Sequence, residues 1–238
     1  MNTNNEYNLA KADVVKPIYS ITPFTLLDYP DKTACILWFA GCNMRCQYCY
    51  NPDIVLGKGK LSYQEILKFL KTRVNLLDGV VLSGGECTLH KNIIKLIVEI
   101  KKMGLLIKVD TNGTKPKIIE FLLKEKLIDY VALDFKAPID KFKSITKSNL
   151  YSNFITSLKL LINSAIPFEV RTTLHSSLLV QNDIQRMIDV LEKFNYEGIY
   201  YIQNFINDTK TIAEIENSRQ NSINTTFFNT KLSVLIRN

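Results

Sequence analysis

Three cysteines stand close together in the segment WFAGCNMRCQYCYNPD, residues 38–53. Cys42, Cys46 and Cys49 follow the spacing C-x3-C-x2-C. Thiolates at such short intervals are typical ligands of zinc and of iron–sulfur clusters, which normally take four protein ligands. The array therefore indicates a metal centre that has one protein ligand too few.

Two other cysteines and two histidines are candidates for the missing ligand. Cys35 lies in the alternating apolar run TACILWF, which favours a core thiol. Cys87 follows SGGE and stays open as an alternative ligand, whereas His90 and His175 lack the Cys-x-x-His arrangement of zinc sites. The remaining alternative is an open position, in which one iron is left free for a substrate or cofactor.

The bulk composition is that of a soluble globular protein. The chain has 238 residues, of which 46% are hydrophobic and 22% charged. No run approaches the roughly 18 apolar residues of a membrane span, and residues 1–17 lack the apolar core of a signal peptide. An odd number of cysteines does not suit a disulfide framework. We expect a cytoplasmic protein without membrane association.

The net charge of +7 comes from lysines that are spread over helix-like segments. Nucleic-acid binding usually needs a denser basic block. We therefore expect no nucleic-acid partner, while a basic face that meets an acidic protein or a nucleotide-loaded partner stays open as an alternative.

Strand-like apolar runs alternate with segments of helical periodicity. The strand candidates are residues 32–40, 78–85, 105–113, 129–138, 167–175 and 198–205. The helix candidates are residues 61–74, 90–104, 115–127, 149–164 and 183–194, the first with a capping box of Ser62 and Glu65. This alternation predicts a parallel α/β sheet with right-handed crossovers, either a partial (β/α)6 barrel or a doubly wound sheet.

Each strand candidate ends in a polar or glycine-rich segment. These segments are GC, SGGE, DTNG, DFK, RTTLH and QN. In parallel α/β folds the carboxyl ends of the strands lie together, and ligands bind there. The sequence therefore predicts an enzyme active site at this end of the sheet, with the cysteine loop as its first part.

The cysteine array after the first strand and SGGE after the second together resemble the radical S-adenosylmethionine (SAM) superfamily. The resemblance implies a TIM-like partial (β/α)6 barrel that binds one [4Fe–4S] cluster through Cys42, Cys46 and Cys49. It also implies that SAM is the second cofactor and that its amino and carboxylate groups chelate the free iron. One electron then cleaves SAM to methionine and a 5′-deoxyadenosyl radical. The two remaining cysteines are too few for a second cluster.

The resemblance extends to residues that contact SAM. Gly84, Gly85 and Glu86 match the segment that holds the methionine amino group, where glycines permit close approach and Glu86 receives the ammonium. Tyr48 matches an aromatic residue that packs near the adenine. The resemblance places Asp110, Thr111, Asp134 and Lys136 in the SAM pocket or at a nearby cation site, and Arg171 at the methionine carboxylate. The alternatives are a surface charge for Glu86, and a structural ion-pair network for Asp110, Asp134 and Arg171.

Residues 18–206 are similar to a narrower family, the activating proteins of anaerobic ribonucleoside-triphosphate reductase. Matching segments include FTLLDYPDKTACILWFAGCNMRCQYCYNPDIV, LSGGECTLH and YVALDFKAP. This similarity implies that the radical abstracts a hydrogen from a glycine of the reductase large subunit and that a flavodoxin-like carrier donates the electron. We expect a polar segment at 1–17, the catalytic core at 18–206, and a tail at 207–238 that acts as a lid or contacts a partner.

Other functions remain open at this point. One alternative is a radical SAM enzyme for a small molecule, such as a 7-carboxy-7-deazaguanine synthase, and another is an activase of a different glycyl-radical enzyme. A non-catalytic iron–sulfur or zinc module would not need SGGE or the polar strand ends. Two positions depart from the family pattern, since Cys87 replaces a usual proline and Tyr50 a frequent histidine.

Overall fold

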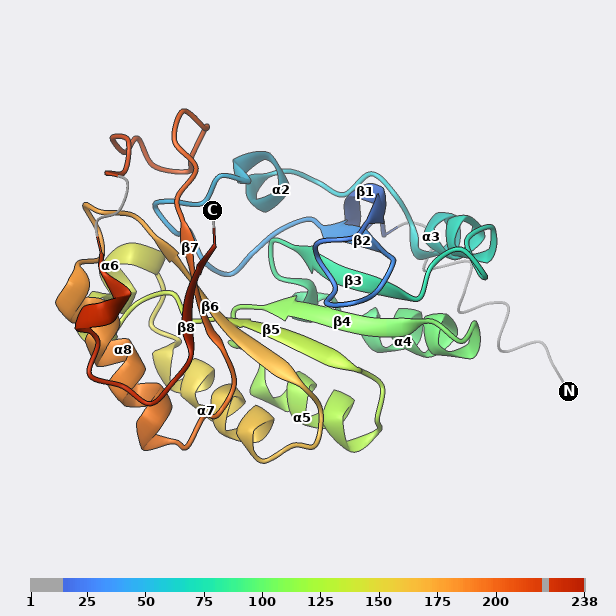
Figure 1. Ribbon diagram of the computed structural model, residues 1–238. Coiled ribbons are helices and arrows are strands. Elements are labelled where there is room, and N and C mark those ends of the chain that lie inside the picture. Colours follow the sequence, from blue (N-terminus) through green and yellow to red (C-terminus); the bar gives the residue numbers. More distant parts are fainter. Residues whose placement is uncertain (1–14, 220–222, 238) are drawn as a thin grey trace, which may run out of the picture.

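A single curved sheet with its strands in chain order forms the centre of the molecule (Figure 1). The computed structural model describes residues 15–219 and 223–237, so most of the predicted 1–17 segment lies outside the described residues. The strands are β1 (Ile18–Thr25), β2 (Ala34–Phe39), β3 (Gly79–Gly84), β4 (Leu106–Thr111), β5 (Tyr130–Asp134), β6 (Phe168–Leu174), β7 (Tyr200–Asn204) and β8 (Val234–Arg237). Neighbours pair in parallel, except that β1 is antiparallel to β2.

The helices follow the strands in the predicted alternation. They are α2 (Pro52–Leu56), α3 (Tyr63–Lys71), α4 (Ile93–Lys102), α5 (Pro116–Lys124), α6 (Ile139–Thr146), α7 (Tyr151–Ile162) and α8 (Gln181–Lys193), with short 3-10 turns η1 (Cys87–Leu89) and η2 (Thr225–Phe227). Figure 1 shows α4, α5 and α7 along one face of the sheet. The strand order runs from β1 to β8 without the reversal that defines a doubly wound sheet. The α/β partial barrel is therefore confirmed, and strands β2–β7 are its six predicted strands.

Four elements were not predicted. Strand β1 contains Pro23 and lies at the edge of the sheet, where a missing backbone N–H is tolerated. Helices α2 and α6 are short segments within predicted loops. Strand β8 lies in the tail and pairs in parallel with β7.

Strands β2, β3 and β5 are buried on both faces along most of their length, which explains their continuous apolar runs. The main core lies between the sheet and the helices, where residues such as Leu37, Leu82 and Ile97 are fully buried. A smaller cluster on the opposite, inner face consists of Tyr29, Ala34, Ile36 and Val81. Each large apolar side chain contributes roughly 1.5–3 kcal/mol when buried.

The predicted capping box at the start of α3 is present. The Glu65 backbone N–H donates to Ser62 Oγ at 3.3 Å, and the Ser62 backbone N–H donates to Glu65 Oε2 at 2.7 Å. These reciprocal bonds satisfy two donors that the helix start would otherwise leave unpaired.

Replacing Ser62 with alanine removes this cap. We expect Ser62→Ala to lower the free energy of unfolding by about 1 kcal/mol, measured by urea denaturation. The matched control is Ser152→Ala in the first turn of α7, where the side chain is exposed and alanine favours the helix. Equal destabilisation by both variants would contradict the role assigned to the cap.

Within the described ranges, no helix combines the length and the apolar character that crossing a membrane requires.

Candidate active site

A cavity of about 230 Å³ lies at the carboxyl ends of the parallel strands. It receives residues from the ends of β2 to β7, as the strand-end pattern predicted. Ten of the twelve predicted site residues line it, namely Cys42, Cys46, Tyr48, Cys49, Gly84, Gly85, Asp110, Asp134, Lys136 and Arg171. Glu86 and Thr111 are not among the lining residues.

Backbone hydrogen bonds hold the cysteine loop against the end of α6. The Arg45 N–H donates to the Thr146 carbonyl at 2.8 Å, and the Gln47 N–H donates to the Ile145 carbonyl at 3.0 Å. Helix α6 thus serves as a support for the loop between Cys42 and Cys49. This contact had no signal in the sequence, because α6 is a short helix inside a segment that was predicted to be a polar loop.

The three thiols line one cavity from a single loop. Burial raises the pKa of Cys42 to about 11 and that of Cys46 to about 12. At neutral pH such thiols are protonated, and a bound metal centre supplies the positive charge that stabilises the thiolates.

The surroundings of the thiols fit a [4Fe–4S] cluster. In such a cluster each thiolate binds a different iron, so the thiols have to border a volume rather than converge on one point. Cys42 Sγ also accepts hydrogen bonds from the Met44 N–H at 3.4 Å and from Asn112 Nδ2 at 3.8 Å. Hydrogen bonds to cluster sulfurs are one of the means by which a protein adjusts the reduction potential.

Gly85 joins the end of β3 to the cysteine loop. Its N–H donates to the Phe39 carbonyl, and the next N–H, of Glu86, donates to the Gly41 carbonyl, both at 2.9 Å. A Cβ added at Gly85 would lie 1.9 Å from the Gly41 oxygen. The glycine is therefore required for contact between two strand ends, a constraint that acts in addition to the predicted close approach to SAM.

Glu86 lies behind the cavity wall in a buried hydrogen-bond network. Its Oε1 accepts from the N–H and Oγ1 of Thr88, at 3.2 and 2.5 Å, and from Thr111 Oγ1 at 2.8 Å. Its Oε2 accepts from the Asn112 N–H at 2.7 Å. Burial raises the pKa of Glu86, and these hydrogen bonds oppose the rise. Both carboxylate oxygens accept hydrogen bonds from the protein, so Glu86 links the ends of β3 and β4. We call this set of hydrogen bonds the Glu86 tie.

A chain of ion pairs also lines the cavity. Arg171 Nη2 lies 3.0 Å from Asp134 and 3.5 Å from Asp110, and Lys136 Nζ lies 3.2 Å from Asp134. Burial alone would raise the pKa of Asp134, but Lys136 and Arg171 lower it below the usual value. Burial alone would lower the pKa of Lys136, but the Asp134 carboxylate raises it well above its usual value. The residues that were predicted to form an ion-pair network therefore also line the cavity.

Several lining residues were missed by sequence reasoning. They are Asp28, Trp38, Met44, Tyr50, Asn51, Val55, Ser83, Asn112, Thr173 and Gln203. Ser83 and Asn112 belong to the motifs SGGE and DTNG, and Thr173 stands two residues after Arg171 on the same strand face. Strand periodicity, extended from Arg171, would have selected Thr173.

Cys35 and Cys87 do not line the cavity and are fully buried in the main core. Burial raises the pKa of Cys35 to about 12, and that of Cys87 well above its usual value. The Cys87 thiol donates to the Asp110 carbonyl at 3.5 Å.

An open parallel α/β barrel with three cysteines of one loop at the strand ends defines a class of cofactor-binding enzymes. The family model described as the radical SAM superfamily matches residues 36–206. The chain belongs to the radical SAM superfamily. Its cofactors are accordingly a [4Fe–4S] cluster and SAM, and Cys42, Cys46 and Cys49 line the cavity from a single loop.

The chain is also similar in sequence to individual proteins. The chain is 34% identical over 195 residues to a Methanocaldococcus jannaschii protein provisionally named a glycyl-radical enzyme activating enzyme, with 79% of each chain covered. It is 35% identical to a pyruvate formate-lyase-activating enzyme of Clostridium pasteurianum, over 56% of this chain and 58% of that protein. A GTP 3′,8-cyclase of Petrotoga mobilis is 28% identical, over 63% of this chain and 48% of that protein.

The fold is similar to that of solved structures. Streptococcus suis SuiB bound to S-adenosylmethionine matches with a TM-score of 0.64 at 14% identity, over 85% of this chain and 52% of that one. The chain therefore spans about half the length of this solved structure, and the likeness concerns the fold alone.

Replacing Glu86 with glutamine tests the Glu86 tie. A glutamine NH2 has no acceptor capacity, so at least one of the surrounding donors would lose its partner. We expect Glu86→Gln to lower the free energy of unfolding by about 1–3 kcal/mol, measured by urea denaturation. The control is Glu99→Gln in α4, where the side chain is 47% exposed and the change should stay within about 0.5 kcal/mol. If both variants were equally stable, the Glu86 tie would be refuted.

Proposed function

We propose that this protein is an activase that uses SAM to generate a glycyl radical on anaerobic ribonucleoside-triphosphate reductase. The observation that carries the activase role is the 34% identity to a protein named for glycyl-radical enzyme activation, over 79% of both chains. The cavity with its three thiols supports it, because the thiols lie within residues 36–206, which the radical SAM family model matches.

The chemistry that the cofactors supply is the one-electron cleavage of SAM to methionine and a 5′-deoxyadenosyl radical, which becomes 5′-deoxyadenosine by taking a hydrogen atom from glycine. The protein binds and orients SAM and the cluster, and it excludes water from the site. Cys42, Cys46 and Cys49 bind the cluster irons.

The charged residues of the cavity wall offer complementary partners for the methionine part of SAM. Asp110 and Asp134 present carboxylates to an ammonium group, and Arg171 and Lys136 present cations to a carboxylate. Glu86 acts one layer behind as a positioning residue, because its own oxygens already accept four hydrogen bonds.

The identity of the partner rests on the segments that resemble activating proteins of the reductase. We propose the reductase large subunit as the glycyl-radical protein, a flavodoxin-like protein as the electron donor and the cytoplasm as the location. A second candidate is a radical SAM enzyme for a small molecule, favoured by the 28% identity to a GTP 3′,8-cyclase.

Anaerobic reconstitution tests the proposal. After iron and sulfide are added, the native protein with dithionite and SAM is expected to form 5′-deoxyadenosine, measured by chromatography. Alanine at Cys42, Cys46 or Cys49 should remove the cluster absorbance and reduce the product by more than about a hundredfold, because each thiolate holds one iron. Cys87→Ala, in the buried core outside the cavity, is the control and should retain both signals.

Addition of the reductase separates the two candidates. A glycyl radical detected by electron paramagnetic resonance is expected if the reductase is the partner. An intact cluster that cleaves SAM but leaves the reductase without a radical would overturn the partner and favour the small-molecule alternative. If the protein with an intact cluster does not cleave SAM, the proposed enzymatic function would be overturned.

A further inference from the structure

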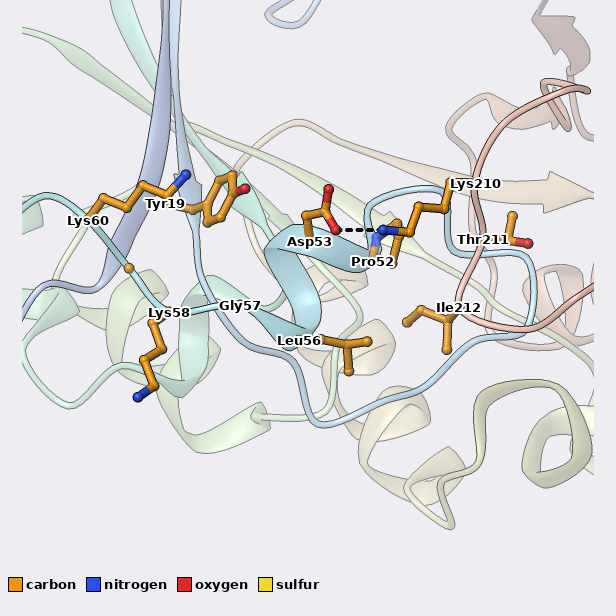
Figure 2. A pocket seen from close by; sticks show the side chains of 11 residues that line it. Tyr19, Pro52, Asp53, Leu56, Gly57, Lys58, Lys60, Lys210, Thr211 and Ile212 are labelled. Carbon is orange, nitrogen blue, oxygen red and sulfur yellow. Dashed lines mark hydrogen bonds and ion pairs between the residues drawn. The ribbon is translucent and has the colours of Figure 1, made fainter.

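A groove of about 710 Å³ lies on the surface next to the cysteine loop (Figure 2). We call it the lysine groove, and its lining residues are Tyr19, Pro52, Asp53, Leu56, Gly57, Lys58, Gly59, Lys60, Lys210, Thr211 and Ile212. It is distinct from the cavity at the strand ends, because the two share no lining residue.

Helix α2 separates the groove from the active-site cavity. Asn51 and Val55 line the cavity, whereas Asp53 and Leu56 line the groove. The wall between the two spaces is thus a single short helix, and an α-helix with its side chains is about 10–12 Å across. A redox group seated in the groove would therefore lie close to the cluster thiols.

The tail connects the groove directly to a cluster ligand. The Ile212 N–H donates to the carbonyl of Cys49 at 3.1 Å, and the Ala213 N–H donates to the carbonyl of Gln47 at 3.3 Å. Ile212 itself lines the groove. One backbone hydrogen bond therefore links the groove wall to the loop that carries the cluster.

Both apolar side chains and lysines line the groove. Leu56, which is 61% exposed, and Ile212 are among the apolar ones, while Lys58, Lys60 and Lys210 supply positive charge (Figure 2). Asp53 is the acidic lining residue, and its ion pair with Lys210 is open to solvent, with side chains 68% and 74% exposed. Such an exposed pair contributes little to stability. Three lysines against one aspartate leave a positive surface that complements an acidic partner.

The groove is preformed by its backbone. The Lys60 N–H donates to the Ile18 carbonyl at 2.7 Å, and a Cβ at Gly59 would lie 1.7 Å from the Lys16 oxygen. Lys60 is also held over the Tyr19 ring, 3.9 Å from its centroid. These contacts place the Lys60 ammonium beside Tyr19 at this end of the groove.

The geometry points to the lysine groove as the docking site of a small acidic one-electron carrier of the flavodoxin type. This inference rests on the proposed function, because SAM cleavage consumes an external electron. The carrier is oxidised by one electron, and that electron breaks a sulfonium C–S bond of SAM to give methionine and the 5′-deoxyadenosyl radical. Transient electron-transfer complexes bury little surface and depend on electrostatic steering, which fits a lysine-rimmed groove.

Charge reversal in the groove tests this docking site. The variant carries Lys58→Glu, Lys60→Glu and Lys210→Glu, and the control carries Lys95→Glu, Lys117→Glu and Lys124→Glu on the exposed outer faces of α4 and α5. Both variants change the net charge equally. The probe is an acidic flavodoxin, whose affinity is measured by calorimetry and whose reduced form drives 5′-deoxyadenosine formation.

We expect the groove variant to weaken flavodoxin binding and the flavodoxin-driven rate by about tenfold or more relative to the control at low salt. The difference should shrink as salt is raised, since exposed charges are screened. Equal loss in both variants, or loss of affinity only for the reductase, would overturn the docking site.

Dithionite separates the two claims, because this small reductant needs no docking surface. The groove variant should cleave SAM with dithionite at the native rate. Lack of cleavage by the native protein with dithionite would overturn the proposed function, while the calorimetric comparison would still decide the docking site.

Discussion

The contact between Gly41 and Gly85 is the constraint on which the site depends. Gly41 begins the cysteine loop after β2, and Gly85 follows β3, where an added Cβ would lie 1.9 Å from the Gly41 oxygen. Glu86 extends this contact to β4 by accepting hydrogen bonds from Thr111 and Asn112. Three successive strand ends are thereby held together, and the cysteine loop is fixed at the edge where the cavity forms.

Much of the fold could be predicted because strands buried on both faces appear as continuous apolar runs. This pattern identified β2 to β7, and the cysteine spacing identified the centre of the site. The pattern could not identify β1, an edge strand interrupted by Pro23, or β8, whose four residues pair only through their tertiary position. The hydrogen bonds that Glu86 accepts also escaped prediction, because the donors converge from two different strand ends.

The charged wall of the cavity shows how one set of residues serves two purposes. Arg171 bridges Asp110 and Asp134 across two strand ends, and the same three side chains face the cavity. Burying these charges carries a large desolvation cost, which their mutual attraction and hydrogen bonds offset. Helix α2 has a comparable double position, since one side borders the cavity and the other borders the lysine groove.

In the proposed site, Cys42, Cys46 and Cys49 would hold a cluster whose free iron SAM would chelate. The most direct test is electron–nuclear double resonance on the reduced protein with SAM labelled with 15N in the amino group and 17O in the carboxylate. Hyperfine coupling of both labels to the cluster is expected, and it should be lost when the label is placed only in the adenine ring. An intact reduced cluster that shows no coupling to the amino or carboxylate label would contradict it.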